Sequence, residues 1–88
     1  MSTEITGFLF VGAYRAKEQH YVREVVEKVF KKVCRNEDGV NSVYYYNGHK
    51  VIRIGFQCRG SCYDSMEEFR QRVYQLYPTA FGFEFFVD

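Results

Sequence analysis

The chain has 88 residues and a mass of 10.5 kDa, which is the size of a single domain. Hydrophobic residues make up 47% and charged residues 26% of the chain, which excludes a disordered or fibrous protein. The net charge of +1 gives no general attraction for nucleic acid, and no apolar run is long enough to cross a bilayer. We therefore expect one domain, residues 1–88, without a membrane partner.

The hydrophobic pattern of the first half of the chain predicts a strand followed by a helix. Thr6–Tyr14 is short, apolar and aromatic, which is typical of a strand. From Ala16 to Arg35, apolar residues recur at steps of three and four between charged ones, and this pattern predicts an amphipathic helix. We expect Val29 to be buried in the middle of its apolar stripe and Cys34 to end the stripe in the core. Asn36–Gly39 then ends the helix.

A hairpin is the strongest local signal in the sequence. Asn47-Gly48 lies between the β-rich segments Ser42–Tyr46 and His49–Cys58, which predicts a two-residue turn with positive φ at Gly48. That turn fixes the register of the two strands. The expected opposite pairs are Tyr46 with His49, Tyr44 with Val51, and Ser42 with Arg53.

The last third predicts a helix followed by a strand. Ser65 and Glu68 have the spacing of a capping box, in which each side chain binds a backbone amide of the first helical turn. Pro78 ends this helix, and Ala80–Val87 is a terminal strand. The apolar stripe of the helix comprises Met66, Phe69, Val73, Leu76 and Tyr77.

These elements give the order β-α-β-β-α-β, which is the ferredoxin-like arrangement of the α+β class. Right-handed crossovers would place both helices on one face of a four-stranded antiparallel sheet, with the first and third strands in the middle. The other face of the sheet would then be open. Many unrelated functions use this arrangement, so it does not by itself assign one.

Alternation along the strands sorts side chains between the two faces. We expect Leu9, Val11, Phe83 and Phe85 to face the helices with the aliphatic hairpin residues, and Phe8 to face outward. The outer face would be rich in rings, and an exposed apolar patch of that kind marks an interaction site. The residues expected to bind a partner there are Phe10, Tyr44, Tyr46, Val51, Arg53 and Phe86.

The cysteine count and the first residues of the chain indicate the cellular compartment. Because Met1–Thr6 contains Glu4 and no basic residue, we expect no secretory signal, and the odd cysteine count favours a reducing compartment, the cytoplasm. Cys58 and Cys62 are spaced more widely than the C-x-x-C of zinc and redox sites, and no second pair completes four ligands. A disulfide between them is sterically possible, but we expect free thiols, with no metal and no cofactor.

The function that these observations favour is a small non-enzymatic interaction domain, such as an adaptor, regulator or inhibitor. It would bind a protein partner or a second copy of itself, as a homodimer, through the aromatic face. No set of catalytic residues stands at a recognisable spacing. We expect no enzyme activity.

Single-stranded nucleic acid is the first alternative. Leu9-Phe10-Val11-Gly12-Ala13-Tyr14 resembles the first-strand motif of RNA-recognition-motif domains, in which rings on the sheet stack on bases. The resemblance implies that Phe10 would stack on a base. The third-strand motif of that family should supply two more outward rings, but here the outward residues are Val51 and Arg53.

A small enzyme is the second alternative. Acylphosphatases share this strand order and bind an anion through an Arg after the first strand and an Asn farther along. Arg15 and Asn41 stand at roughly those places, although the glycine-rich anion loop of that family is missing.

Overall fold

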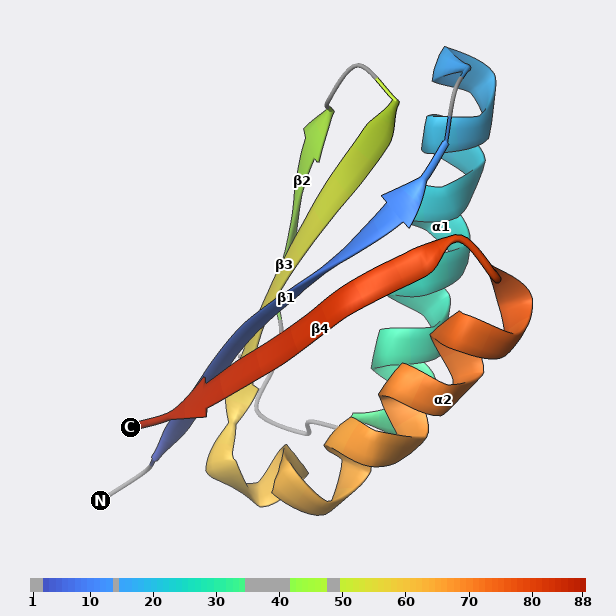
Figure 1. Cartoon of the computed structure of the whole chain (residues 1–88). Coiled ribbons are helices and arrows are strands. Elements are labelled where there is room, and N and C mark those ends of the chain that lie inside the picture. The colour runs from blue at the N-terminus through green and yellow to red at the C-terminus, as the bar shows by residue number, and fades with distance from the viewer. Residues whose placement is uncertain (1–2, 14, 35–41, 48–49) are drawn as a thin grey trace.

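A computed structural model describes residues 3–13, 15–34, 42–47 and 50–88, with residues 16 and 42–47 described by their backbone alone. The chain forms strand β1, helix α1, the hairpin strands β2 and β3, a 3-10 helix η1, helix α2 and strand β4 (Figure 1). The bounds of these elements are Glu4–Gly12, Ala16–Val33, Ser42–Asn47, Val51–Arg59, Gly60–Ser65, Met66–Leu76 and Ala80–Val87, in that order.

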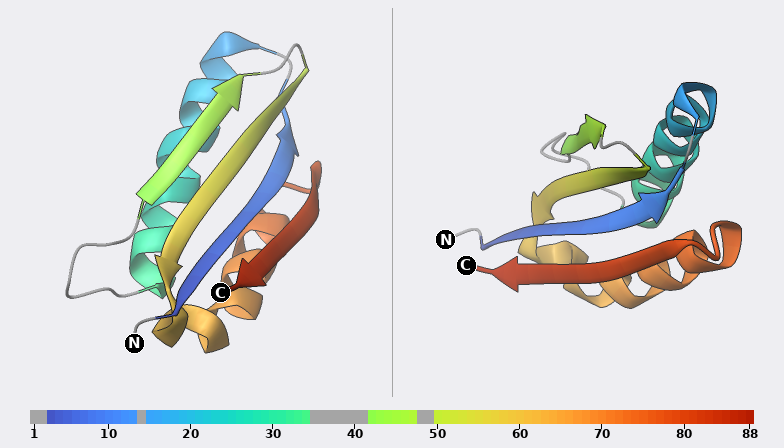
Figure 2. Two further views of the ribbon diagram at one scale, coloured as in Figure 1. Left: turned by 90° about the vertical axis from the view of Figure 1, so that its left-hand side faces the viewer. Right: turned by 45° about the horizontal axis from the view of Figure 1, so that its top comes forward.

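The strands form one antiparallel sheet in the order β2-β3-β1-β4. Both helices lie on the same side of this sheet, as the left view of Figure 2 shows with the strands in front and the helices behind. No helix or strand in the described ranges covers the front face. The molecule therefore has two layers, with a core between helices and sheet and one open sheet face.

The α+β class is confirmed, but the ferredoxin-like arrangement expected from the sequence needs correction in its details. The pairing of β4 with β1 is not a continuous ladder, because its register shifts between Phe8 and Phe10. Only β2-β3-β1 is regularly paired throughout. The chain also contains an element that the sequence did not predict, the 3-10 helix η1 between β3 and α2.

The 3-10 helix explains why the expected capping box at Ser65 is wrong. Ser65 already has helical backbone angles, and its side chain makes no capping hydrogen bond. Because η1 runs directly into α2, the first turn of α2 follows helical backbone and not a free end. The carboxylate of Glu68 instead accepts a hydrogen bond from Arg72, one turn farther on, at 2.8 Å.

The predicted two-residue hairpin turn is also wrong. Asn47 pairs with Ile52 and Tyr46 with Arg53, which shifts the register by four residues from the expected one. Asn47 is the last residue of β2 and is paired with β3, so it does not occupy the turn position that the Asn-Gly signal assigns to it. The φ angle of Gly48 lies outside the described residues, as does His49. Because four is an even number, the alternation between the two faces is preserved.

A cluster of four phenylalanine rings joins the two layers. Phe69 of α2 contacts Phe30 of α1 and Phe56 of β3, with ring centroids 5.1 and 5.3 Å apart. Phe83 of β4 stacks on Phe56 at 5.6 Å, so both helices and two strands meet at this point. Large rings allow a small domain to bury enough apolar surface to fold.

The apolar stripes of the helices are confirmed in part. Met66, Phe69 and Val73 of α2 are buried, whereas Leu76 is 53% exposed because it is the last residue of the helix. Val29 of α1 is only half-buried, contrary to the expectation. The buried line of α1 is Val22, Val26, Phe30 and Cys34, at steps of four residues, slightly more than one helical turn.

Candidate functional site: the open face and a cysteine cluster

The open face of the sheet carries a row of aromatic side chains. Leu9 and Val11 of β1 are fully buried toward the helices, which confirms the phase predicted for this strand. Phe8 and Phe10 alternate with them and are half-buried on the other side. A soluble surface rarely keeps neighbouring rings of this size uncovered.

The rings of the open face contact one another. Phe10 stacks on Phe81 of β4 with centroids 5.2 Å apart, and it meets Phe8 edge to face at 5.8 Å. The guanidinium carbon of Arg53 lies 5.1 Å from the centre of the Phe8 ring, within the range of a cation–π contact. The side chains are therefore held in place by their neighbours before any partner binds. We call Phe8, Phe10, Arg53, Phe81 and Phe86 the ring face.

Phe81 lies on the ring face because the pairing of β4 with β1 is irregular, which the alternation in the sequence did not predict. Strict alternation from the outward Glu84 would turn Phe81 toward the helices. Gly82 has φ of +70°, in the shifted part of the β1–β4 ladder, and it turns Phe81 outward to pair with Phe10. A Cβ atom at Gly82 would lie 2.9 Å from the Phe10 ring, so glycine also makes room for that ring. A glycine inside a strand is the signal that could have revealed the bulge.

The six residues expected to bind a partner are placed as follows. Phe10, Arg53 and Phe86 lie on the ring face, where Arg53 is exposed and Phe86 is 61% exposed. Val51 is half-buried at the end of β3, opposite Gly12. The backbones of Tyr44 and Tyr46 pair with Gly55 and Arg53, whereas their side chains lie outside the described residues.

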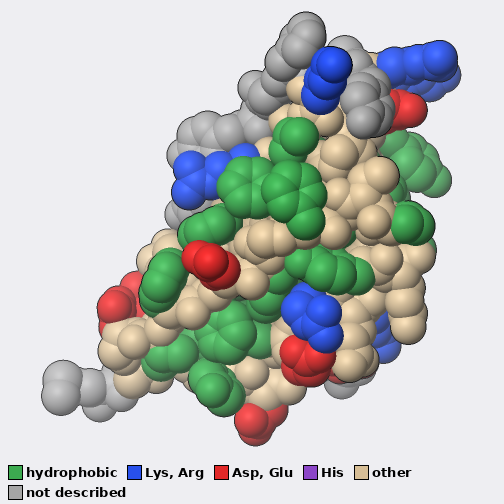
Figure 3. Space-filling model, in the orientation of Figure 1, with side chains coloured by type: hydrophobic (Ala, Val, Ile, Leu, Met, Phe, Trp, Pro, Cys, Tyr) green, Lys and Arg blue, Asp and Glu red, His purple; other side chains and the backbone are tan. Residues whose placement is uncertain are grey.

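The charged groups on this face balance one another. Arg53 of β3 pairs with Phe10, and Glu84 of β4 pairs with Phe8, so one positive and one negative side chain flank the rings on opposite sides of β1. Figure 3 looks at the β4 edge of the sheet, with the open face toward the left. It shows hydrophobic side chains gathered along this edge, with separate charged groups among them.

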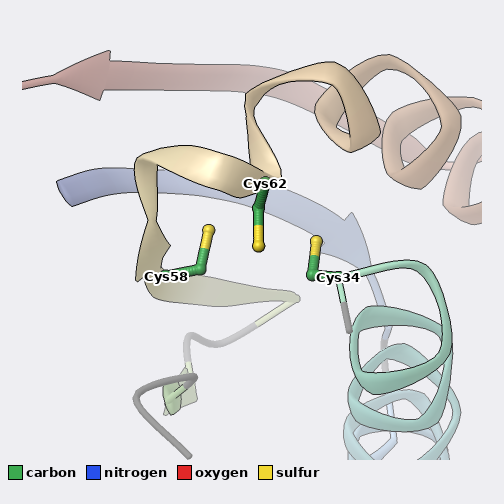
Figure 4. Close-up of side chains that lie close together, drawn as sticks. All are labelled: Cys34, Cys58 and Cys62. Carbon is green, nitrogen blue, oxygen red and sulfur yellow. The ribbon is translucent and has the colours of Figure 1, made fainter. Parts of the chain in front are cut away.

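The second feature is a cluster of three buried thiols. Cys34 at the end of α1, Cys58 in β3 and Cys62 in η1 have their sulfur atoms within 4.8 Å of one another (Figure 4). None of the three forms a disulfide, and none is more than 3% exposed. Nothing in the sequence indicated that Cys34 lies beside the other two.

The turn after β3 brings Cys62 back over Cys58. The backbone amide of Gly60 donates a hydrogen bond to the carbonyl of Thr3 at 2.8 Å, and a Cβ atom at Gly60 would overlap the Thr3 side chain. The sequence pattern indicated that Cys34 and Cys58 both face the core. Cys34 continues the buried line of α1, and Cys58 follows Ile52, Ile54 and Phe56 in the inward phase of β3.

The three thiols differ in acidity because they share hydrogen bonds. Hydrogen bonds from Cys34 and Cys62 lower the pKa of the Cys58 thiol, since they stabilise its thiolate. The hydrogen bond to Cys58, together with burial, raises the pKa of Cys34 far above its ordinary value. Burial and the neighbouring Cys58 raise the pKa of Cys62. Cys58 is therefore the thiol that ionises first.

This arrangement predicts how stability depends on pH. A thiol whose pKa is raised in the folded state contributes stability below its unfolded pKa of about 8.5 and loses it as the pH rises toward the folded value. Cys34 and Cys62 have this sign, whereas Cys58, whose pKa is lowered, has the opposite one. Because two thiols have a raised pKa and one a lowered pKa, we expect wild type to lose stability as the pH rises above about 8.5, measured by urea unfolding with a reductant present. A free energy of unfolding that stays constant or increases above that pH would contradict this prediction.

The end of β1 does not resemble an anion cradle. Arg15 is exposed at the start of α1 beside a partly open cavity of about 720 Å³. Its backbone amide donates a hydrogen bond to the Glu18 carboxylate at 3.0 Å, and Gln19 donates one to the Ala13 carbonyl at 3.0 Å. The carboxylate would repel a phosphate at this position. Asn41, the other residue of the acylphosphatase-like alternative, lies outside the described residues.

Among the helices of the described ranges, none is both long enough and apolar enough to span a membrane. Comparisons with protein-family models, curated proteins and solved structures found no match for this chain.

Proposed function

We propose that this chain is a non-enzymatic interaction domain that binds protein through its ring face, and that the protein is a second copy of the chain. The observation that supports this most strongly is the uncovered stack of Phe10 on Phe81. Phe8 and Arg53 hold the neighbouring positions. Aromatic residues and Arg are the side chains enriched in the buried centres of protein interfaces.

The charges favour a second copy as the partner. The net charge of +1 does not oppose self-association, and Arg53 and Glu84 lie on opposite sides of β1. A two-fold axis parallel to β1 would lay β3 of one copy over β4 of the other. Each Arg53 would then approach the partner's Glu84, which makes the surface complementary to itself.

Nucleic acid fits this surface less well. A base-stacking sheet needs rings on both central strands, but the outward positions of β3 include Arg53, Gly55 and Gln57. The adjacent Glu84 would also repel phosphates. We place the protein in the cytoplasm, because three reduced thiols in one small domain suit a reducing compartment.

Light scattering coupled to size-exclusion chromatography tests the proposal. We expect wild type to have twice the chain mass of 10.5 kDa and the double variant Arg53→Ala/Phe86→Ala to be a folded monomer. Each truncated side chain should weaken association by about 2 kcal/mol, and a two-fold dimer of the double variant lacks four of them. The dissociation constant should therefore rise about a millionfold if the effects add.

The matched control removes a ring and a cation from the helical side. Tyr21 and Lys28 are both exposed on α1, and we expect Tyr21→Ala/Lys28→Ala to remain a dimer. A wild type that is monomeric throughout the concentration range would overturn the choice of partner. Nucleic acid that co-purifies and is released by Lys31→Glu/Lys32→Glu, a change on α1, would instead support the nucleic-acid alternative.

A further inference from the structure

We propose that Cys34, Cys58 and Cys62 form a binding site for one soft metal ion, held by three sulfur ligands. The three sulfur atoms come from three different elements and converge in one buried place. Soft thiolate ligands select ions such as Cu(I) and Zn(II). This site lies in the core between the helices and the sheet, and it does not depend on the ring face.

The spacing of the sulfur atoms fits a metal ion better than a disulfide. With metal–sulfur bonds of about 2.3 Å, three sulfur ligands in a plane around an ion lie about 4 Å apart. The sulfur atoms already lie within 4.8 Å of one another, so each pair needs to approach by less than about 1 Å. A disulfide would require two of them to approach to about 2 Å and would leave the third thiol unused.

The chemistry of the three buried side chains supports the same assignment. A metal ion binds thiolate sulfur, so the thiols lose their protons when the ion binds. An entering cation would replace those protons, which makes binding stronger as the pH rises. Within the described residues, no His, Asp or Glu joins the three cysteines in the cluster. Three ligands suit Cu(I), whereas Zn(II) usually takes four.

The test is a titration of the reduced wild-type protein with each ion in the absence of oxygen. Cu(I) is added in competition with a coloured Cu(I) chelator, and Zn(II) in competition with a coloured zinc chelator. We expect one Cu(I) per chain, tighter binding at higher pH, and a rise in the urea midpoint on loading, since an ion bound only by the folded state stabilises it. One Zn(II) per chain with three sulfur ligands would also support the site and would identify the ion as zinc.

Two further measurements keep the outcome independent of mutant folding. X-ray absorption of the metal-loaded wild type should show three sulfur neighbours at about 2.2–2.3 Å. Cys34→Ala should lower the affinity at least tenfold, whereas substitution of the exposed neighbour Lys32→Ala should not change it. Failure of both ions to bind, or fewer than three sulfur neighbours, would overturn the proposal. Formation of a disulfide in place of metal binding would also overturn it.

Discussion

Phe69→Ala is expected to destabilise the fold by about 3–5 kcal/mol, a large share of the total stability of a small domain. The Phe69 ring is fully buried and contacts the rings of Phe30, Phe56 and Phe83. Its removal would leave a cavity at the point where both helices meet the sheet. Urea unfolding monitored by circular dichroism gives the free energy directly.

The control for this prediction is Leu76→Ala on the same helix. Leu76 is 53% exposed, so its truncation should cost less than about 1 kcal/mol. A loss below about 1 kcal/mol for Phe69→Ala would show that α2 does not pack on the sheet as described.

Gly7→Ala is the second large expected effect, at about 3 kcal/mol. Gly7 lies in the inward phase of β1 between the buried Ile5 and Leu9. An added Cβ atom would overlap the Phe56 ring and lie 2.6 Å from the backbone carbonyl oxygen of Glu84. The ring cannot move without disturbing its neighbours, and the backbone of β4 cannot move without breaking its pairing with β1.

Gly12→Ala provides the comparison in the same strand. The nearest atom to an added Cβ at Gly12 belongs to the Thr79 side chain, at 3.1 Å. We expect this variant to unfold at a urea concentration close to that of wild type, and Gly7→Ala at a much lower one. Equal midpoints for the two variants would contradict the close packing of Phe56 against β1.

The element order and most of the core follow from the sequence because hydrophobic period is a strong signal. The three- and four-residue steps from Ala16 onward located α1, which ends at Val33, and alternation assigned Leu9 and Val11 to the core. The predicted hairpin register is wrong because Asn47, which the Asn-Gly signal assigns to the turn, is instead paired within β2. A turn signal sets the register only where its residues lie in the turn.

The candidate sites were predictable to different degrees. Alternation placed Phe10, Arg53 and Phe86 on the open face, but no simple pattern reveals a bulge that turns Phe81 outward at Gly82. The thiol cluster depends on contacts between residues far apart in the chain, since Cys34 and Cys58 belong to different elements. Such proximity follows from the packing of α1 on β3 and not from spacing along the sequence.

The most direct measurement of the central claim is an isotope-filtered NOE experiment on an equal mixture of labelled and unlabelled chains. It detects only contacts between protons of different copies. If two ring faces pack together, the ring protons of Phe10 and Phe81 should show contacts across the interface, and exposed Tyr21 on α1 should show none. Intermolecular contacts confined to the helical side, or their absence at concentrations where wild type is a dimer, would contradict the claim.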